Sequence, residues 1–188
     1  PFVIAEMSGN HNGDLERARA IVRAAADAGA HAVKMQTYTA DTMTIPVDDD
    51  PRFVVSPDHP LWGGRTLHSL YEEAHTPWAW HEELFALGAE LGIVVFSTPF
   101  DDAAVDLLES LGAPAYKVAS LELVDLPLIR RVAATGKPVI LSTGAAVVSE
   151  IDEAVRAARD AGCQDLVVLA CTSSYPAPPE QTNLRSIP

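Results

Sequence analysis

Cysteine, lysine and long apolar runs are all scarce in this sequence. Its 188 residues include two cysteines, Cys163 and Cys171, whose spacing matches neither a zinc motif nor a disulfide framework. No apolar run reaches the roughly 20 residues that a membrane-spanning helix needs, and no basic segment followed by a long apolar stretch opens the chain. We therefore expect reduced thiols and a cytoplasmic protein.

Positive charge is also in short supply. There are 26 Asp and Glu residues against 13 Lys and Arg residues, which gives a formal net charge of -13. Because binding to a nucleic-acid backbone relies on clustered Lys and Arg, we expect no nucleic-acid partner. Hydrophobic residues make up 48% of the chain, which indicates a globular protein with one real core.

The placement of the three lysines is informative. Lys34 lies in Ala-Val-Lys-Met-Gln and Lys117 in Tyr-Lys-Val-Ala-Ser, both apolar segments, whereas Lys137 lies in a Gly-Lys-Pro turn. A buried ammonium group is costly unless it is paired. Lys34 and Lys117 therefore predict a shared cationic pocket for a phosphate or carboxylate. The alternative is that each lysine pairs with an Asp or Glu of the protein.

Short apolar segments alternate with amphipathic ones along the chain. The apolar segments predict strands at residues 2–6, 32–37, 93–98, 115–119, 139–142 and 166–170. The amphipathic segments predict helices at residues 15–28, 80–91, 103–111, 126–134 and 149–161. A glycine precedes most of the strands, as at the C-terminal ends of helices: Gly29, Gly92, Gly112, Gly136 and Gly162.

Continuous apolar strands between helices are typical of a parallel sheet, in either a doubly wound sheet or a (β/α)8 barrel. Polar residues follow nearly every strand, which favours the barrel, because a doubly wound sheet gathers them at one switch point. About six of eight βα units are present, so residues 1–188 are expected to be a catalytic barrel incomplete at its C-terminus, without a second domain. Residues 40–77 form a long insertion on the face of the active-site loops.

Neutral donors stand at equivalent points near four strand ends: Gln36, Thr98, Ser120 and Ser142. Together with the two lysines they could cradle a phosphate, although Ser and Thr also commonly cap the next helix. Glu6 ends the first strand, where it could move a proton or pair with Lys34.

The loop after the first strand and the long insertion add further candidates. Asn10 and His11 lie in this loop, where His11 could touch a substrate or form local hydrogen bonds. The aromatic residues of the insertion and its edge could cover a sugar or form a small core: Trp62, Tyr71, Trp78 and Trp80.

Six motifs resemble, in one order, those of the sialic acid synthase family. They are Ala5-Glu6 with Gly9-Asn10-His11-Asn12-Gly13, Val33-Lys34-Met35-Gln36, Phe96-Ser97-Thr98-Pro99-Phe100-Asp101, Tyr116-Lys117-Val118-Ala119-Ser120, Leu141-Ser142-Thr143-Gly144 and Cys171-Thr172-Ser173-Ser174-Tyr175-Pro176. Within the family, residues 70–81 and Ser173 resemble the pseudaminic acid branch.

The resemblance implies a transferase that joins phosphoenolpyruvate to an open-chain acetamido-hexose, giving a nine-carbon 2-keto sugar acid and phosphate. Glu6 and Lys117 would be catalytic, with Glu6 beside the reacting carbons. Ser173 and Tyr175 would face the sugar, as Asn10 and His11 could. The phosphoenolpyruvate would be held by Lys34, Gln36, Thr98, Lys117, Ser120 and Ser142.

The resemblance also implies Mn²⁺ or Mg²⁺ acting as a Lewis acid on the aldehyde, and a homodimer. The family's metal-binding motifs, Ser-Asp-His and Glu-Lys-His, do not occur before Pro188, so the ligands are expected beyond it and no metal ligand is assigned here. We expect the family's C-terminal antifreeze-like domain to lie outside residues 1–188 as well. We expect the chain alone to be inactive, and its exposed sheet edges to favour association.

Three alternatives stay open. The enzyme could make N-acetylneuraminate or legionaminate instead of pseudaminic acid. The lysine pocket could belong to a noncatalytic phosphosugar-binding barrel, or the chain could be a folding unit without a ligand.

Overall fold

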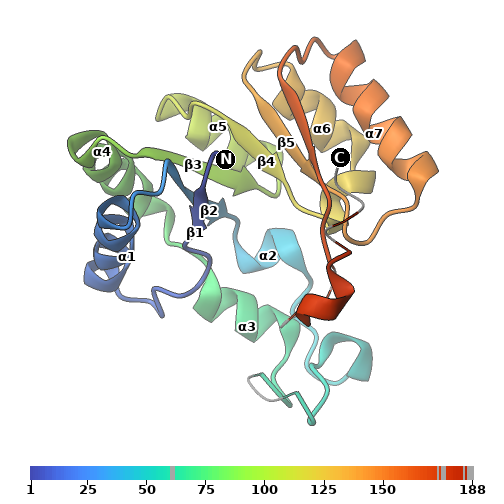
Figure 1. The fold of residues 1–188 in the computed structure, drawn as a ribbon. Helices are drawn as coiled ribbons and strands as arrows, with labels where there is room; N and C mark the ends of the chain where they lie inside the picture. Colours follow the sequence, from blue (N-terminus) through green and yellow to red (C-terminus); the bar gives the residue numbers. More distant parts are fainter. Residues whose placement is uncertain (60–61, 173, 175–176, 184, 186–188) are drawn as a thin grey trace. The chain divides into compact units, whose positions relative to one another are not determined.

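The computed structural model describes residues 1–59, 62–172, 174, 177–183 and 185, and it divides into two compact units (Figure 1). The first unit is Pro1–Ala113 and the second is Pro114–Pro188. All six predicted strands are present, three in each unit, and they differ from the predicted bounds by at most two residues at either end. Within each unit the strands are parallel wherever the pairing is described.

The first unit is built on strands that follow chain order, β1 (Ile4–Glu6), β2 (Ala32–Thr37) and β3 (Val94–Pro99). Its main helices are α1 (Leu15–Asp27), α4 (His81–Leu91) and α5 (Asp102–Ser110). The buried side chains between the sheet, α1 and α4 form one apolar cluster that includes Met7, Val22, Val33, Met35 and Leu84. Val33 and Met35 of β2 point into this cluster. Successive side chains of a strand point to opposite faces, so Lys34 and Gln36 face the other side of the sheet.

The insertion after β2 has more regular structure than its composition predicts. It contains α2 (Ala40–Met43), the 3₁₀ turn η1 (Pro51–Phe53) and α3 (Leu67–Ala74), and a second 3₁₀ turn, η2 (Trp78–Trp80), leads into α4. The hydroxyl of Thr66 accepts the N–H of Ser69 and so caps α3. This cap was a local signal for a helix that our prediction of one long insertion did not include.

The second unit repeats the same construction. Its strands are β4 (Tyr116–Val118), β5 (Val139–Ser142) and β6 (Leu166–Leu169). The helical elements are η3 (Leu121–Val124), α6 (Leu126–Ala133), α7 (Val148–Asp160) and η4 (Pro179–Gln181). On β6, Val167 and Val168 remain about half exposed, at 50% and 46%.

Local sequence signals account for most helix ends. Asp14, Asp101 and Asp125 accept backbone N–H groups at the starts of α1, α5 and α6. The five glycines predicted to end helices all have positive φ, a conformation that strains any residue with a Cβ: Gly29, Gly92, Gly112, Gly136 and Gly162. Within the described part of the chain, no helix is both long and apolar enough to cross a membrane.

Gly88 allows α4 to lie close against β3. A Cβ at this position would overlap the side chain of Val95 and would lie 3.0 Å from the carbonyl oxygen of Ile93. We expect Gly88→Ala to lower the free energy of unfolding by about 1–3 kcal/mol, because the overlap outweighs the gain in helix propensity of about 1 kcal/mol. Urea denaturation measures this change, and Glu90→Ala on the exposed side of α4 is the control. Equal stability of the two variants would contradict the packing argument.

Candidate functional site

A buried lysine stands at the centre of the candidate site in the first unit. Nζ of Lys34 lies 2.6 Å from Oε2 of Glu6 and 3.3 Å from the hydroxyl of Thr98. These residues belong to three adjacent strands, β2, β1 and β3, and Glu6 is in register with Lys34. The Lys34 side chain is 9% exposed and that of Glu6 is 44% exposed. Pairing of Lys34 with a carboxylate, the alternative that the sequence left open, is therefore present in the structure.

The partly open position of Glu6 decides what this pair can do. A buried ammonium needs a counter-charge at all times, and Glu6 supplies one from the solvent side of the pair. Because almost half of the Glu6 side chain reaches solvent, water can hydrate its carboxylate if another anion approaches Lys34. The arrangement is thus compatible with both a structural ion pair and an exchangeable anion site.

Ser8 is a contact residue that sequence reasoning missed. Its N–H donates to Oε1 of Glu6 at 3.1 Å, and its hydroxyl donates to Oε1 of Gln36 at 3.0 Å. Gln36 is in register with Thr98 on β3. Glu6, Lys34 and Thr98 are thus in direct contact, and Ser8 links Gln36 to them through Glu6.

Asn10 and His11 have different surroundings. Asn10 is exposed, and its amide donates to the carbonyl of Met7 at 3.0 Å. His11 is fully buried, Nδ1 accepts the N–H of Gly13, and Nε2 donates to the hydroxyl of Thr76 at 3.2 Å. Burial, and secondarily the nearby His75, lowers the pKa of His11. His11 therefore forms local hydrogen bonds, which is one of the two roles considered for it from the sequence. Contact of His11 with a substrate stays a prediction.

The second unit contributes the other predicted group. Lys117 is half-buried on β4, and its Nζ lies 3.5 Å from the carbonyl oxygen of Val118. Burial raises the pKa of Glu122, and the positive charge of Lys117 opposes that rise. The hydroxyl of Ser120 accepts the N–H of Gly144 at 3.2 Å, which ties the loop after β4 to the loop after β5.

Ser142 is the last residue of β5, and it is 4% exposed. It pairs in register with Leu169 on β6. The next residue, Thr143, donates its hydroxyl to the carbonyl of Leu169 at 2.7 Å. The strand end that carries Ser142 is thereby fixed to its neighbour, which defines the position of the Ser142 backbone.

The aromatic residues of the insertion mostly pack on other rings. Trp80 meets His11 edge-on at 5.4 Å between ring centroids, and Tyr71 meets the buried Tyr38 at 5.9 Å. The indole N–H of Trp78 donates to the carbonyl of Tyr38 at 3.3 Å. Trp62 differs, since it is 39% exposed and stacks on a neighbouring histidine. Three of the four aromatic residues thus follow the core alternative.

A second polar network, which the sequence analysis did not predict, joins His81, Thr37 and Ser97. Nε2 of the fully buried His81 lies 2.8 Å from the hydroxyl of Thr37, which lies 2.6 Å from that of Ser97. Nδ1 of His81 donates to the carbonyl of Pro77 at 3.3 Å. Burial lowers the pKa of His81 to about 4, although its backbone contacts with Pro77 and Trp78 oppose the change. A neutral imidazole therefore joins β2, β3 and the start of α4.

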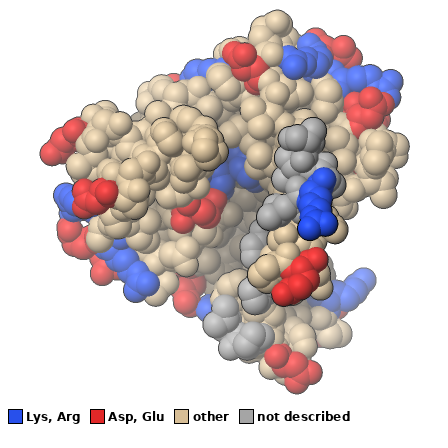
Figure 2. Space-filling view, viewed as in Figure 1, with Lys and Arg blue, Asp and Glu red and all other residues tan. Residues whose placement is uncertain are grey.

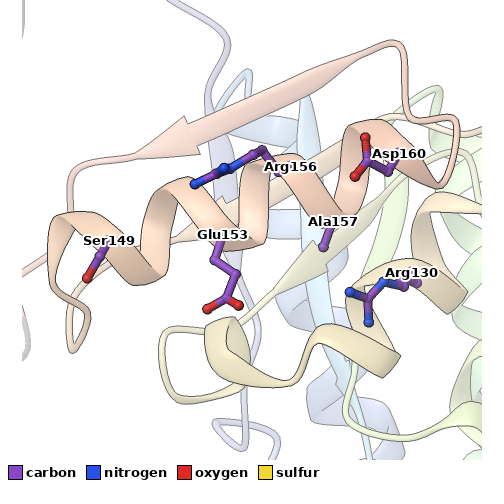
Figure 3. Close-up of a pocket in the computed structure, with 6 residues that line it drawn as sticks. All are labelled: Arg130, Ser149, Glu153, Arg156, Ala157 and Asp160. Carbon is purple, nitrogen blue, oxygen red and sulfur yellow. The ribbon is translucent and has the colours of Figure 1, made fainter.

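The second unit also has a surface hollow of about 410 Å³ between α6 and α7 (Figure 3). It is lined by Arg130, Ser149, Glu153, Arg156, Ala157 and Asp160. Positive and negative side chains are interspersed over these helices in Figure 2, and the two arginines of the hollow are matched by two acidic residues. With this balance the hollow has no preference for an anion, and it contains none of the predicted site residues.

Two predicted residues, Ser173 and Tyr175, lie outside the described residues. Among the residues that are described, no three His, Cys, Asp or Glu side chains come together to hold a metal ion. Cys163 and Cys171 are free thiols, the first buried and the second exposed.

Comparison with known proteins places these groups in a family context. A family model described as the NeuB family matches residues 21–188. Pseudaminic acid synthase of Helicobacter pylori is 44% identical over 187 residues, which cover 100% of this chain and 54% of that protein. N,N'-diacetyllegionaminic acid synthase of Campylobacter jejuni is 34% identical, over 99% of this chain and 55% of the relative. The chain thus spans about half the length of these relatives.

A solved structure shows the same fold. The N-acetylneuraminic acid synthetase of Leptospira borgpetersenii, crystallised with citrate, matches with a TM-score of 0.84 at 30% identity. The match covers 99% of this chain and 59% of that one. The prediction of a (β/α)8-type fold, of which this chain supplies six βα units, is confirmed.

Proposed function

Because the chain belongs to the NeuB family, we propose that this protein condenses phosphoenolpyruvate with the open-chain form of an acetamido-hexose. The products are a nine-carbon 2-keto sugar acid and inorganic phosphate. Carbon three of phosphoenolpyruvate forms the new bond to the aldehyde carbon, and the aldehyde oxygen takes up a proton. Water adds to carbon two, the bond from carbon two to the phosphate oxygen breaks, and the ketone remains. Of the two protons that the water loses, one balances the proton taken up by the aldehyde oxygen and the other leaves with the phosphate.

The observation that carries the proposal is the buried Lys34 ammonium with a partly exposed counter-charge. Lys34 is almost fully buried, whereas Glu6, its counter-charge, is 44% exposed. The phosphate or carboxylate of phosphoenolpyruvate can replace Glu6 as the partner of Lys34, with Thr98 and Gln36 as further donors. Glu6 then remains beside the bound substrate, where a carboxylate can orient water or move a proton.

The residues of the second unit enter the same proposal. Lys117 supplies a second cation for the phosphoenolpyruvate, and Ser120 and Ser142 supply hydroxyl groups. Their support is the half-buried position of Lys117, the hydrogen bond that holds Ser120 in the loop after β4, and the paired strand end at Ser142. A cation next to the leaving phosphate stabilises the charge that develops when the bond from carbon two to oxygen breaks.

A divalent metal belongs to the proposal for the whole protein, but the described residues do not form a site for one. We assign its ligands to positions after Pro188, and no step above passes through it. A homodimer is proposed on the same family grounds. Asn10, His11, Ser173 and Tyr175 are proposed to contact the sugar.

For the sugar, we propose the precursor of pseudaminic acid. The relative named pseudaminic acid synthase is 44% identical to this chain, against 34% for the relative named N,N'-diacetyllegionaminic acid synthase. Product analysis with competing amino sugars tests the choice between pseudaminic, legionaminic and N-acetylneuraminic acid. A product with the legionaminic or neuraminic configuration would overturn it.

We expect the 188-residue chain by itself to bind phosphoenolpyruvate without turning it over. The proposed anion-binding residues up to Ser142 are within it, whereas it spans only 54% of its relative from Helicobacter pylori. A thermal shift with phosphoenolpyruvate measures binding, and release of inorganic phosphate in the presence of amino sugar and Mn²⁺ measures turnover.

Two outcomes would contradict this expectation. Turnover by the chain alone at the rate of the complete protein would show that the further residues are dispensable. Binding of phosphate by a complete protein that never consumes phosphoenolpyruvate, with any amino sugar tested, would favour a noncatalytic phosphosugar-binding barrel.

A further inference from the structure

Ser8 connects two residues of the proposed anion site. It donates its N–H to Glu6 at 3.1 Å and its hydroxyl to Oε1 of Gln36 at 3.0 Å. Glu6 in turn lies 2.6 Å from Nζ of Lys34. The first serine after β1 therefore contacts both the carboxylate that neutralises the lysine and the amide proposed to bind phosphoenolpyruvate.

The backbone of Ser8 is in an unfavourable conformation. Its φ is +47°, in the left-handed region that residues with a Cβ seldom adopt. Such conformations persist where the surrounding structure fixes them, and they gather at functional sites. A glycine at position 8 would adopt this φ without strain, but it would have no hydroxyl for Gln36.

The residues on both sides of Ser8 are anchored in the first unit. Met7 is fully buried in the apolar cluster, and the fully buried His11 is hydrogen-bonded to Thr76. Between them, Gly9 packs against the end of α3, where a Cβ would lie 3.0 Å from the carbonyl oxygen of Ala74. The loop is thus held at several points, so the position of the Ser8 hydroxyl is defined.

We propose that Ser8 is a positioning residue for the substrate anion, acting through the amide of Gln36. With Oε1 accepting the Ser8 hydroxyl, the two N–H groups of Nε2 are left to donate to a phosphate or carboxylate oxygen, and no described residue accepts from them. The reversed amide would present its carbonyl oxygen to the anion and repel it. This proposal rests on the proposed function, because Gln36 is assigned there to phosphoenolpyruvate.

The test compares two variants of the complete protein with a matched control. Ser8→Ala removes the hydroxyl and keeps the strain, whereas Ser8→Gly removes the hydroxyl and relieves the strain. Asn12 is the control position, because it lies in the same loop, is exposed and has a φ of +50°. Asn12→Gly therefore places a glycine at a similar φ in the same loop without touching Gln36.

We expect both Ser8 variants to raise KM for phosphoenolpyruvate roughly tenfold, with kcat and the KM for the amino sugar changed by less than about threefold. The melting temperature of Ser8→Gly should equal or exceed that of the parent, and Asn12→Gly should keep the parental KM. A merely structural role would lower the melting temperature of both Ser8 variants and leave KM unchanged.

A KM within about twofold of the parent in both Ser8 variants would overturn the positioning role while leaving the proposed function intact. A parent protein that neither binds nor consumes phosphoenolpyruvate would refute the proposed function itself. The parent protein alone gives that result, and it would also refute the proposed role of Ser8.

Discussion

Replacing Lys34 with methionine in the complete protein is expected to lower kcat/KM for phosphoenolpyruvate by roughly 10²–10³-fold. Loss of one partner of a desolvated, hydrogen-bonded charge pair costs about 2–5 kcal/mol, and the middle of that interval, about 3–4 kcal/mol, corresponds to this fall. The Lys34 side chain is 9% exposed, so water cannot substitute for it at the substrate anion. The fall in kcat/KM is measured with phosphate release at limiting phosphoenolpyruvate.

The loss should not reflect unfolding. Methionine fills most of the volume of the lysine stem, and the remaining Glu6 is 44% exposed and can be hydrated. We expect the free energy of unfolding to change by no more than about 1 kcal/mol, measured by urea denaturation. Lys137→Met is the matched control, because Lys137 precedes β5, at the end of that strand opposite to Ser142, and contacts the ring of Tyr116.

Glu6→Gln separates an anion site from a structural ion pair. If Lys34 serves only to pair with Glu6, the two variants Lys34→Met and Glu6→Gln should have similar effects on the binding of inorganic phosphate. If Lys34 binds the substrate anion, Lys34→Met should weaken phosphate binding and Glu6→Gln should strengthen it, because the competing carboxylate is gone. Parallel weakening in isothermal titration calorimetry would contradict the anion site.

The strands and most helix ends could be predicted because their signals are local. The residues of β2 alternate between an apolar cluster and a polar face, and glycines such as Gly29 and Gly92 adopt the positive φ that ends a helix. The burial of Lys34 could likewise be predicted, because its neighbours in the strand are apolar. In each case the predictive signal lies within a few neighbouring residues of the chain.

The contacts of the site could be predicted only in part, because they depend on residues far apart in the sequence. The pair of Glu6 and Lys34 was one of two open alternatives, since a strand end specifies a face but not a partner. Ser8 and Gln36 are hydrogen-bonded although they lie 28 positions apart in the sequence. The positive φ of Ser8 could not be predicted either, because a serine gives no indication of a left-handed backbone. His81 reaches Thr37 across 44 positions, and nothing in its helix distinguishes it from an exposed histidine.

Acidification is expected to destabilise the first unit through His81. The pKa of His81 is lowered from 6.5 to about 4 in the folded protein, so the unfolded chain binds a proton near pH 6.5 and the folded one does not. The stabilisation is complete above pH 6.5 and is lost as the pH falls from 6.5 towards 4. At 1.36 kcal/mol per pH unit, the loss reaches about 3 kcal/mol over this window.

Two variants isolate this contribution in urea denaturation between pH 7 and pH 5. His81→Gln removes the titrating group, so its free energy of unfolding should fall less steeply than that of the parent, by roughly 2 kcal/mol less over this interval. Thr37→Val removes the hydroxyl that contacts His81 but keeps the buried imidazole, so it should lower stability at every pH and keep the parental slope. Carboxylates and His11 titrate in all three proteins and cancel in the comparison. Identical slopes for the parent and His81→Gln would show that folding does not lower the pKa of His81, and the acid sensitivity of the first unit would then have to come from other groups.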